Sequence, residues 1–260
     1  MQYVKPKKNL GQHFLHDEDI AKRITSCLTG HDDYMHVLEI GPGTGILSKY
    51  LMRDENRHWM GMEIDSESVE YLKSNYPDFI NQIIMADFLK TDLKNLFPED
   101  KIAVIGNFPY NISSQILFKV LENRNQIVEV VGMFQKEVAQ RVAAGPGGKV
   151  NGILSVLCRA FYEVEYLFQV NENVFNPPPK VKSAVIRLKR NRVKKLECDE
   201  KLFFKVVKTA FNQRRKTLKN SLKQMNVDWS RASEVLSGKR AEQLDVIDFV
   251  TIVNAISESV

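Results

Sequence analysis

Cysteine is scarce in this sequence. Its 260 residues include three, Cys27, Cys158 and Cys198, and they lie far apart. They form no C-x-x-C pair and no spacing typical of a zinc site, and an odd number argues against a disulfide framework. We therefore expect reduced, buried thiols in a cytoplasmic protein, and no bound metal.

Long apolar runs are missing as well. No 18 consecutive residues are apolar, which predicts no membrane-spanning helix and no membrane partner. The basic N-terminal residues 1–9 lack the apolar segment of a signal peptide. Since 43% of the residues are hydrophobic, the chain can still form a core large enough for one large domain and a small one.

The glycine-rich loop of this chain matches neither of two common phosphate-binding motifs. Gly41-Pro42-Gly43-Thr44-Gly45 follows a predicted buried strand, Val37–Ile40, and precedes a predicted helix, Ile46–Met52. A dinucleotide loop needs a further glycine at position 46, and a P-loop needs a Gly-Lys-Ser/Thr end. Strand, glycine loop and helix still form the first unit of a nucleotide-binding α/β sheet. We expect the backbone at Gly41 and Gly43 to approach a ligand that is not held by a pyrophosphate.

Acidic residues end the next two predicted strands. Glu63 and Asp65 close the run Trp59–Asp65, and Asp87 closes Ile83–Asp87. In dinucleotide folds a carboxylate about 20 residues beyond the glycine loop binds ribose hydroxyls, so we assign that role to Glu63. The alternative is a cap for the following helix, a role that Asp65 can fill. Asp87 can accept a hydrogen bond from an adenine amino group.

The fourth predicted strand, Ile102–Ile105, leads into Asn107-Phe108-Pro109-Tyr110. Pro109 fixes its own φ angle and disfavours helix at the residue before it, so the strand should end at Asn107. Ligands of open α/β sheets bind at the carboxyl ends of the strands. The Asn107 side-chain oxygen and the Phe108 carbonyl can accept N–H bonds from an exocyclic amine while Tyr110 stacks on its base. The simpler alternative is a turn with Tyr110 as a core aromatic residue.

Three more strands complete the predicted sheet. We expect them at Ile127–Phe134, Val164–Val170 and Val181–Leu188, with helices at Gln115–Leu121, Gln135–Val142 and Ile153–Phe161. Phe175 begins a proline-rich extended segment. It either forms the second face of a base sandwich with Tyr110 or fills the core, and both interpretations stay open.

Positive charge is concentrated in the last third of the chain. Residues 187–240 hold 17 Lys and Arg against 5 Asp and Glu, a net +12, whereas the whole chain carries +5. We predict one long helix from Asp199 to Leu222, whose second half carries Arg214, Arg215, Lys216 and Lys219. This asymmetry favours nucleic acid as a partner over a merely solvated helical surface. A charged linker near residue 190 predicts two domains, 1–190 and 191–260.

The predicted site residues together describe a nucleoside pocket without phosphate recognition, which fits S-adenosylmethionine. The acceptors at Asn107 and Phe108 would lie beside it, at the end of the next strand. Adenine N6 is a poor nucleophile because its lone pair is delocalised into the ring. Two acceptors that hold its N–H groups favour a pyramidal nitrogen and direct the lone pair at the sulfonium methyl group. No strong base is required, because the methylated ammonium loses its proton readily to water.

Several motifs resemble those of the rRNA adenine N6,N6-dimethyltransferases that modify small-subunit ribosomal RNA. The resemblance covers residues 7–244. It rests on Leu10-Gly-Gln-His-Phe-Leu15, Glu39-Ile-Gly-Pro-Gly-Thr-Gly45, Glu63-Ile-Asp65, Asn107-Phe-Pro-Tyr-Asn-Ile-Ser113, Gln135-Lys-Glu-Val138, Phe175-Asn-Pro-Pro-Pro-Lys-Val181, Ser183-Ala-Val185 and Ala210-Phe-Asn-Gln-Arg-Arg-Lys-Thr-Leu218. The combination is far more specific than any one of these motifs.

The resemblance implies a Rossmann-like, seven-stranded class I methyltransferase sheet with a small C-terminal all-helical domain. It implies a target base between Tyr110 and Phe175, and RNA as the partner of the basic residues. The cofactor residues that it implies, together with Gly43 and Ile64, which we add, are His13, Leu15, Gly41, Gly43, Glu63, Ile64, Asp87 and Asn107. Two residues depart from the pattern, since many members have Asn in place of His13, and Leu is usual in place of Phe108.

The implied substrate is a pair of adjacent adenines in the 3′-terminal hairpin of small-subunit rRNA, each dimethylated within an immature 30S particle by a monomeric enzyme. Two alternatives stay open. A large-subunit rRNA adenine dimethyltransferase of the antibiotic-resistance type has similar catalytic motifs, although the Phe-Asn-Gln-Arg-Arg-Lys helix favours the small-subunit enzyme. The basic C-terminal region also permits a non-catalytic assembly factor that docks on immature small subunits.

Overall fold

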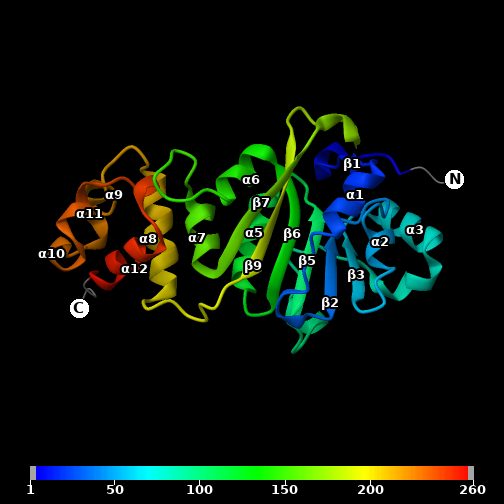
Figure 1. Ribbon diagram of the computed structural model, residues 1–260, viewed down its shortest axis with the longest axis horizontal. Helices are drawn as coiled ribbons and strands as arrows, with labels where there is room; N and C mark the ends of the chain where they lie inside the picture. Colours follow the sequence, from blue (N-terminus) through cyan, green and yellow to red (C-terminus); the bar gives the residue numbers. More distant parts are fainter. Residues whose placement is uncertain (1–3, 257–260) are drawn as a thin grey trace. The chain divides into compact units, whose positions relative to one another are not determined.

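The computed structural model describes residues 4–256, and these divide into two compact units (Figure 1). Unit 1 contains residues 4–139 and 164–190, and unit 2 contains residues 140–163 and 191–256. The sequence had placed residues 140–163 in the first domain. They group with unit 2 because their helix packs its apolar side against the helices that follow residue 190.

A seven-stranded sheet forms the centre of unit 1, in the order β4-β3-β2-β5-β6-β9-β7. Neighbouring strands from β4 to β6 run parallel, and β9 runs antiparallel to β6. The strands are β2 (His36–Ile40), β3 (His58–Glu63), β4 (Ile83–Met85), β5 (Ile102–Asn107), β6 (Ile127–Gln135), β7 (Tyr162–Val170) and β9 (Ser183–Arg190). The predicted α/β class and its seven strands are confirmed.

The strand ends decide where the candidate site residues lie. β5 ends at Asn107, as Pro109 predicts. β4 ends at Met85, so Asp87 lies two residues into the loop rather than at the strand end. β9 begins at Ser183, not at Val181.

Helices α1 (Glu18–Thr25), α2 (Ser48–Leu51) and α3 (Ser66–Asn75) supply apolar side chains to the core at one face of this sheet. Asp17 caps α1 by accepting from the Asp19 and Ile20 N–H groups, each at 3.0 Å. Asp65 occupies the N-cap position of α3, the alternative foreseen for the acids after β3. Unit 1 also contains α4 (Leu93–Leu96) and α5 (Ser113–Glu122), and α6 (Lys136–Val142) follows β6.

A second, two-stranded sheet was not predicted. β1 (Phe14–Leu15) pairs antiparallel with β8 (Phe175–Asn176), with Phe14 opposite Asn176 and Leu15 opposite Phe175. The Val174 carbonyl extends the pairing by accepting from the His16 N–H at 3.0 Å. This small sheet fixes the N-terminal segment beside the proline-rich segment.

Unit 2 is helical. Its helices are α7 (Ile153–Phe161), α8 (Glu200–Asn212), α9 (Leu218–Ser221), α10 (Trp229–Ala232), α11 (Glu234–Gly238) and α12 (Val246–Asn254). Asp199 caps α8, as predicted, through the Leu202 N–H at 2.7 Å.

The prediction of one long helix to Leu222 is wrong. α8 ends at Asn212, and Thr217 has an extended backbone (ψ 159°) before α9 begins. Arg214 lies in the intervening turn and donates hydrogen bonds to the Lys149 and Asn151 carbonyls, which hold the turn. Apolar spacing continues through Leu218 and Leu222, and both side chains are buried, which is why periodicity alone missed the break.

No helix within residues 4–256 combines the length and the apolar character needed to cross a membrane. In the same part of the chain, no group of three or more His, Cys, Asp or Glu side chains is placed to hold a metal ion.

Candidate active site

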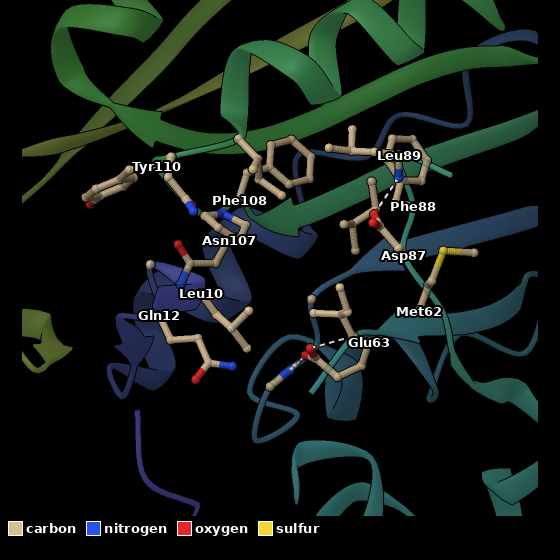
Figure 2. Close-up of a pocket in the computed structure, with 18 of the residues that line it drawn as sticks. Leu10, Gln12, Met62, Glu63, Asp87, Phe88, Leu89, Asn107, Phe108 and Tyr110 are labelled. Atoms are coloured by element: carbon tan, nitrogen blue, oxygen red, sulfur yellow. Dashed lines mark hydrogen bonds between the residues drawn. The ribbon is translucent and has the colours of Figure 1, made fainter. Parts of the chain in front are cut away.

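A cavity of about 180 Å³ opens at the carboxyl ends of the parallel strands in unit 1 (Figure 2). Its walls are the N-terminal segment Leu10–Phe14, the glycine loop, and the residues that follow β3, β4 and β5. Nine of the predicted site residues line it: His13, Gly41, Gly43, Glu63, Ile64, Asp87, Asn107, Phe108 and Tyr110. Leu15 and Phe175 do not.

The glycine loop exposes backbone to this cavity. Gly41 and Gly43 both have positive φ angles, 67° and 58°, which side chains rarely adopt. A Cβ atom at Gly43 would lie 2.9 Å from the Phe14 ring, whereas one at Gly41 would meet no atom within 4 Å. Gly43 thus lets the N-terminal segment pack closely, and Gly41 leaves space for a ligand.

Glu63 connects the glycine loop to the end of β3. Its carboxylate accepts from the backbone N–H groups of Gly43 (3.0 Å), Ile64 (2.8 Å) and Asp65 (3.0 Å). Burial raises the pKa of this carboxyl, although the three N–H groups act in the opposite direction. A carboxylate offers about four lone pairs, so acceptor capacity remains for a ligand hydroxyl at the cavity wall.

Asp87 and Ile64 add one polar and one apolar surface. Asp87 accepts from the Leu89 N–H at 2.9 Å, which orients its carboxylate. The Ile64 side chain is 52% exposed, although it lines the cavity. Figure 2 shows Glu63 and Asp87 across the cavity from Asn107 and Tyr110. An apolar residue beside two acceptors suits a flat base that carries a ribose.

The Asn107 carboxamide is oriented by the N-terminal segment. Its nitrogen donates to the His13 carbonyl at 2.8 Å. Because a carbonyl can only accept, this contact identifies the nitrogen. The side-chain oxygen is left as an acceptor, and no group within residues 4–256 donates to it. Asn107 therefore offers an acceptor at the end of β5.

Phe108 contributes its backbone rather than its ring. The ring is 1% exposed and packs edge-on against Phe134, with ring centroids 5.1 Å apart. Gly132 makes room for it, because a Cβ there would lie 2.3 Å from the ring. The Phe108 N–H donates to the Met133 carbonyl at 3.2 Å, and within residues 4–256 no backbone N–H donates to the Phe108 carbonyl. That carbonyl is thus a second acceptor beside the Asn107 oxygen.

Tyr110 is held in place by residues distant in the sequence. Its hydroxyl lies 2.5 Å from Ser183 Oγ, and its ring stacks on His13 with centroids 5.5 Å apart and an interplanar angle of 28°. Burial raises the pKa of the Tyr110 hydroxyl. Tyr110 lies in the cavity wall, and its contact with Ser183 was not predicted.

The N-terminal segment is also fixed at its other end. Lys7 forms ion pairs with Asp65 and with Glu67, the latter at 3.2 Å. Gln12 accepts from the Lys7 N–H at 2.8 Å and lines the cavity. Sequence reasoning did not assign Gln12, although it lies inside the Leu10–Leu15 motif.

Leu15 and Phe175 lie outside the cavity lining. Both are buried, at 3% and 2% exposed, and both belong to the core beneath the two-stranded sheet. Phe175 lies in the core in this structure, opposite Leu15 in the two-stranded sheet, and is not among the residues that line the cavity. Leu15 borders only a small hollow behind the glycine loop.

The four basic residues assigned to RNA lie in unit 2 and differ from one another. Arg214 is partly buried and tied to the Lys149 and Asn151 carbonyls, with Glu242 at 3.5 Å. The side chains of Arg215, Lys216 and Lys219 are exposed. Arg214 shapes the turn, and the other three are available to a partner.

Comparison with known proteins identifies similar chains. The family model described as ribosomal RNA adenine dimethylase matches residues 4–258. The ribosomal RNA small subunit methyltransferase A of Cytophaga hutchinsonii is 58% identical over 257 residues, which is 99% of each chain.

Two solved structures resemble the fold over almost the whole chain. A dimethyladenosine transferase from Plasmodium falciparum has a TM-score of 0.76 at 25% identity, covering 92% of this chain and 96% of that one. The 23S rRNA methyltransferase ErmE has a TM-score of 0.73 at 25% identity, covering 94% and 99%.

Proposed function

The chain belongs to the ribosomal RNA adenine dimethylase family, and we infer from this membership and from the cavity that it methylates adenine N6 in small-subunit rRNA. The target consists of two adjacent adenines in the 3′-terminal hairpin, each converted to N6,N6-dimethyladenosine. S-adenosylmethionine, when bound, supplies the methyl group. The small-subunit target is supported by the 58% identical relative, against 25% identity to ErmE.

The cofactor assignment rests on the wall formed by Gly41, Gly43, Glu63, Ile64 and Asp87. Glu63 accepts from the ribose hydroxyls, Asp87 accepts from the adenine amino group, and Ile64 packs on the base. The bare backbone at Gly41 lets the amino-acid part approach. These donors and acceptors fit an adenosine that carries no phosphate.

The target adenine enters beside Asn107, Phe108 and Tyr110. The Asn107 oxygen and the Phe108 carbonyl accept the two N6 hydrogens, and Tyr110 stacks on the ring. The acceptors orient the nitrogen lone pair toward the cofactor side of the cavity, so catalysis depends on position and not on a strong base.

The two units have different roles. The catalytic residues lie within residues 1–190, of which α7 belongs to unit 2. Residues 191–260 bind RNA through Arg215, Lys216 and Lys219. The protein acts as a cytoplasmic monomer on an immature 30S particle, where the hairpin is still accessible.

The observation that carries this function is the free acceptor pair at the end of β5, across the cavity from Glu63. The test is methyl transfer from labelled S-adenosylmethionine to small subunits that lack the modification, with large subunits in parallel and mass mapping of the products. We expect two adjacent dimethyladenosines in the small-subunit hairpin. Methylation confined to the large subunit would assign the enzyme to the antibiotic-resistance type.

The cofactor wall has its own test. Glu63→Ala should weaken S-adenosylmethionine binding by about 1–3 kcal/mol, the scale of unpaired hydroxyls, measured by calorimetry without RNA. Glu70→Ala removes an exposed carboxylate on α3 that does not line the cavity and serves as the matched control. Equal affinity of the Glu63 variant and the wild-type protein would show that Glu63 does not bind the ribose.

A further inference from the structure

Tyr110 is anchored by side chains that lie outside its own motif. Ser183, at the start of β9, is completely buried and places Oγ 2.5 Å from the Tyr110 hydroxyl. This contact limits rotation of the ring at its outer edge. The only polar atom of the Tyr110 side chain is thus fixed to the central sheet.

His13 fixes the same ring from one face. Its Nδ1 lies 2.7 Å from the Pro177 carbonyl, so Nδ1 carries the hydrogen and donates. Its own backbone carbonyl accepts from the Asn107 carboxamide at 2.8 Å. His13 therefore contacts both the acceptor residue and the stacking residue, and it is itself held by the proline-rich segment.

This arrangement leaves one face of Tyr110 for a base. The centroids of His13 and Tyr110 are 5.5 Å apart. A base inserted between two rings needs roughly 7 Å, twice the 3.4 Å stacking distance of nucleic acids. The target adenine must therefore stack on the face of Tyr110 opposite His13.

We propose that Ser183 and His13 are positioning residues for the target adenine, acting through Tyr110. This inference rests on the proposed function, because it explains how the stacking wall is held relative to the Asn107 oxygen. Neither residue touches the adenine. His13, which the sequence assigned to the cofactor, uses its ring on the side of the target base.

The hydroxyl contact is tested with Ser183→Ala, Tyr110→Phe and the double variant. Each single variant should lower the methyl-transfer rate on bound small subunits roughly five- to tenfold, the scale of one neutral hydrogen bond. The double variant should be no slower than either single variant, since both remove the same contact. S-adenosylmethionine affinity should stay within twofold of wild type. Ser237→Ala, a buried serine on α11 in unit 2, is the matched control and should not change the rate.

His13→Ala separates the two possible roles of that residue. A positioning role predicts a slower transfer step with unchanged S-adenosylmethionine affinity measured without RNA. Weaker cofactor binding with an unchanged transfer rate would show that His13 binds the cofactor, and would overturn this part of the inference.

The Ser183 proposal is overturned if Tyr110→Phe methylates at the wild-type rate, because that variant keeps the ring and loses only the hydroxyl. A double variant whose methyl-transfer rate is lowered by the product of the two single-variant factors would also overturn it. If the wild-type protein methylates no rRNA at all, the proposed function itself is wrong. The wild-type measurement shows this before any variant is compared.

Discussion

Asn107 combines two roles within one side chain. Its nitrogen fixes the N-terminal segment through the His13 carbonyl, and its oxygen faces the cavity as an acceptor. The neighbouring Phe108 ring is buried and contributes rigidity only. Neutral acceptors in fixed positions suit the proposed reaction, which needs no strong base.

Glu39 is a buried acid that the proposed reaction does not use. Its carboxylate accepts from Ser48 Oγ at 2.7 Å and from Trp59 Nε1 at 2.9 Å. Burial nevertheless raises its pKa to about 7. Between pH 4.5 and 7 the folded protein keeps this proton while the unfolded chain has lost it, so stability falls as pH rises through that window.

Glu39→Gln should remove this pH dependence. The wild-type penalty is absent below pH 4.5 and reaches about 3 kcal/mol above pH 7, at 1.36 kcal/mol per pKa unit. Urea unfolding at pH 5 and pH 8 should therefore show a smaller loss of stability for the variant. Glu63 contributes in the same direction in both proteins and cancels in the comparison. Identical pH dependence in both proteins would show that Glu39 is ionised in the fold.

Individual site residues were predictable where chemistry and a local turn coincide. Pro109 identified the end of β5, and the acid spacing identified Glu63. Ser183 was not predictable, because its partner Tyr110 lies 73 positions away and a serine in a strand carries no distinctive signal.

At the level of elements, the turn between α8 and α9 changes how the basic region is interpreted. Arg214 is committed to the Lys149 and Asn151 carbonyls, so neutralising it would disturb unit 2 itself. Arg215, Lys216 and Lys219 are exposed and can be changed without loss of internal contacts. The charge count of the sequence could not separate these two groups.

Replacing Arg215, Lys216 and Lys219 by alanine should flatten the salt dependence of RNA binding. The slope of log binding constant against log salt should fall in magnitude by about 2 to 3, close to one per lost phosphate contact. A charge-matched control replaces the exposed residues Arg192, Lys194 and Lys195. Equal slopes for the two triple variants would indicate that Arg215, Lys216 and Lys219 form a solvated surface and do not contact RNA.

Elements with long, regular patterns were predicted well, and short ones were not. The apolar runs gave all seven strands of the large sheet. β1 and β8 have two residues each, too few for any periodicity, and their pairing spans most of the chain. The break after Asn212 was missed because apolar spacing continued across it.

At the scale of the whole molecule, chain order and spatial grouping differ. Residues 140–163 precede β9 in the sequence but belong to unit 2, where the Phe161 ring stacks on Phe204 at 6.3 Å. Nothing in a local pattern indicates which unit a helix such as α7 joins. The charge pattern of the sequence indicates the linker near residue 190. No sequence feature indicates that the chain enters unit 2 already at residue 140.

A fragment ending at Arg190 should therefore fail to fold cooperatively. It would retain α7 but lose α8 and α12, the helices against which α7 packs. We expect aggregation or a broad thermal transition, measured by circular dichroism and light scattering against the intact chain. A monomeric fragment with a sharp transition would show that α7 is stable with unit 1 alone.

We propose that a neutral acceptor at Asn107 directs adenine N6 toward the methyl donor. The most direct measurement is the single-turnover rate of Asn107→Ala on unmodified small subunits, with S-adenosylmethionine saturating. We expect a loss of at least about a hundredfold, the scale for removing one preorganised polar group, while the variant still binds small subunits. A rate within threefold of wild type would contradict it.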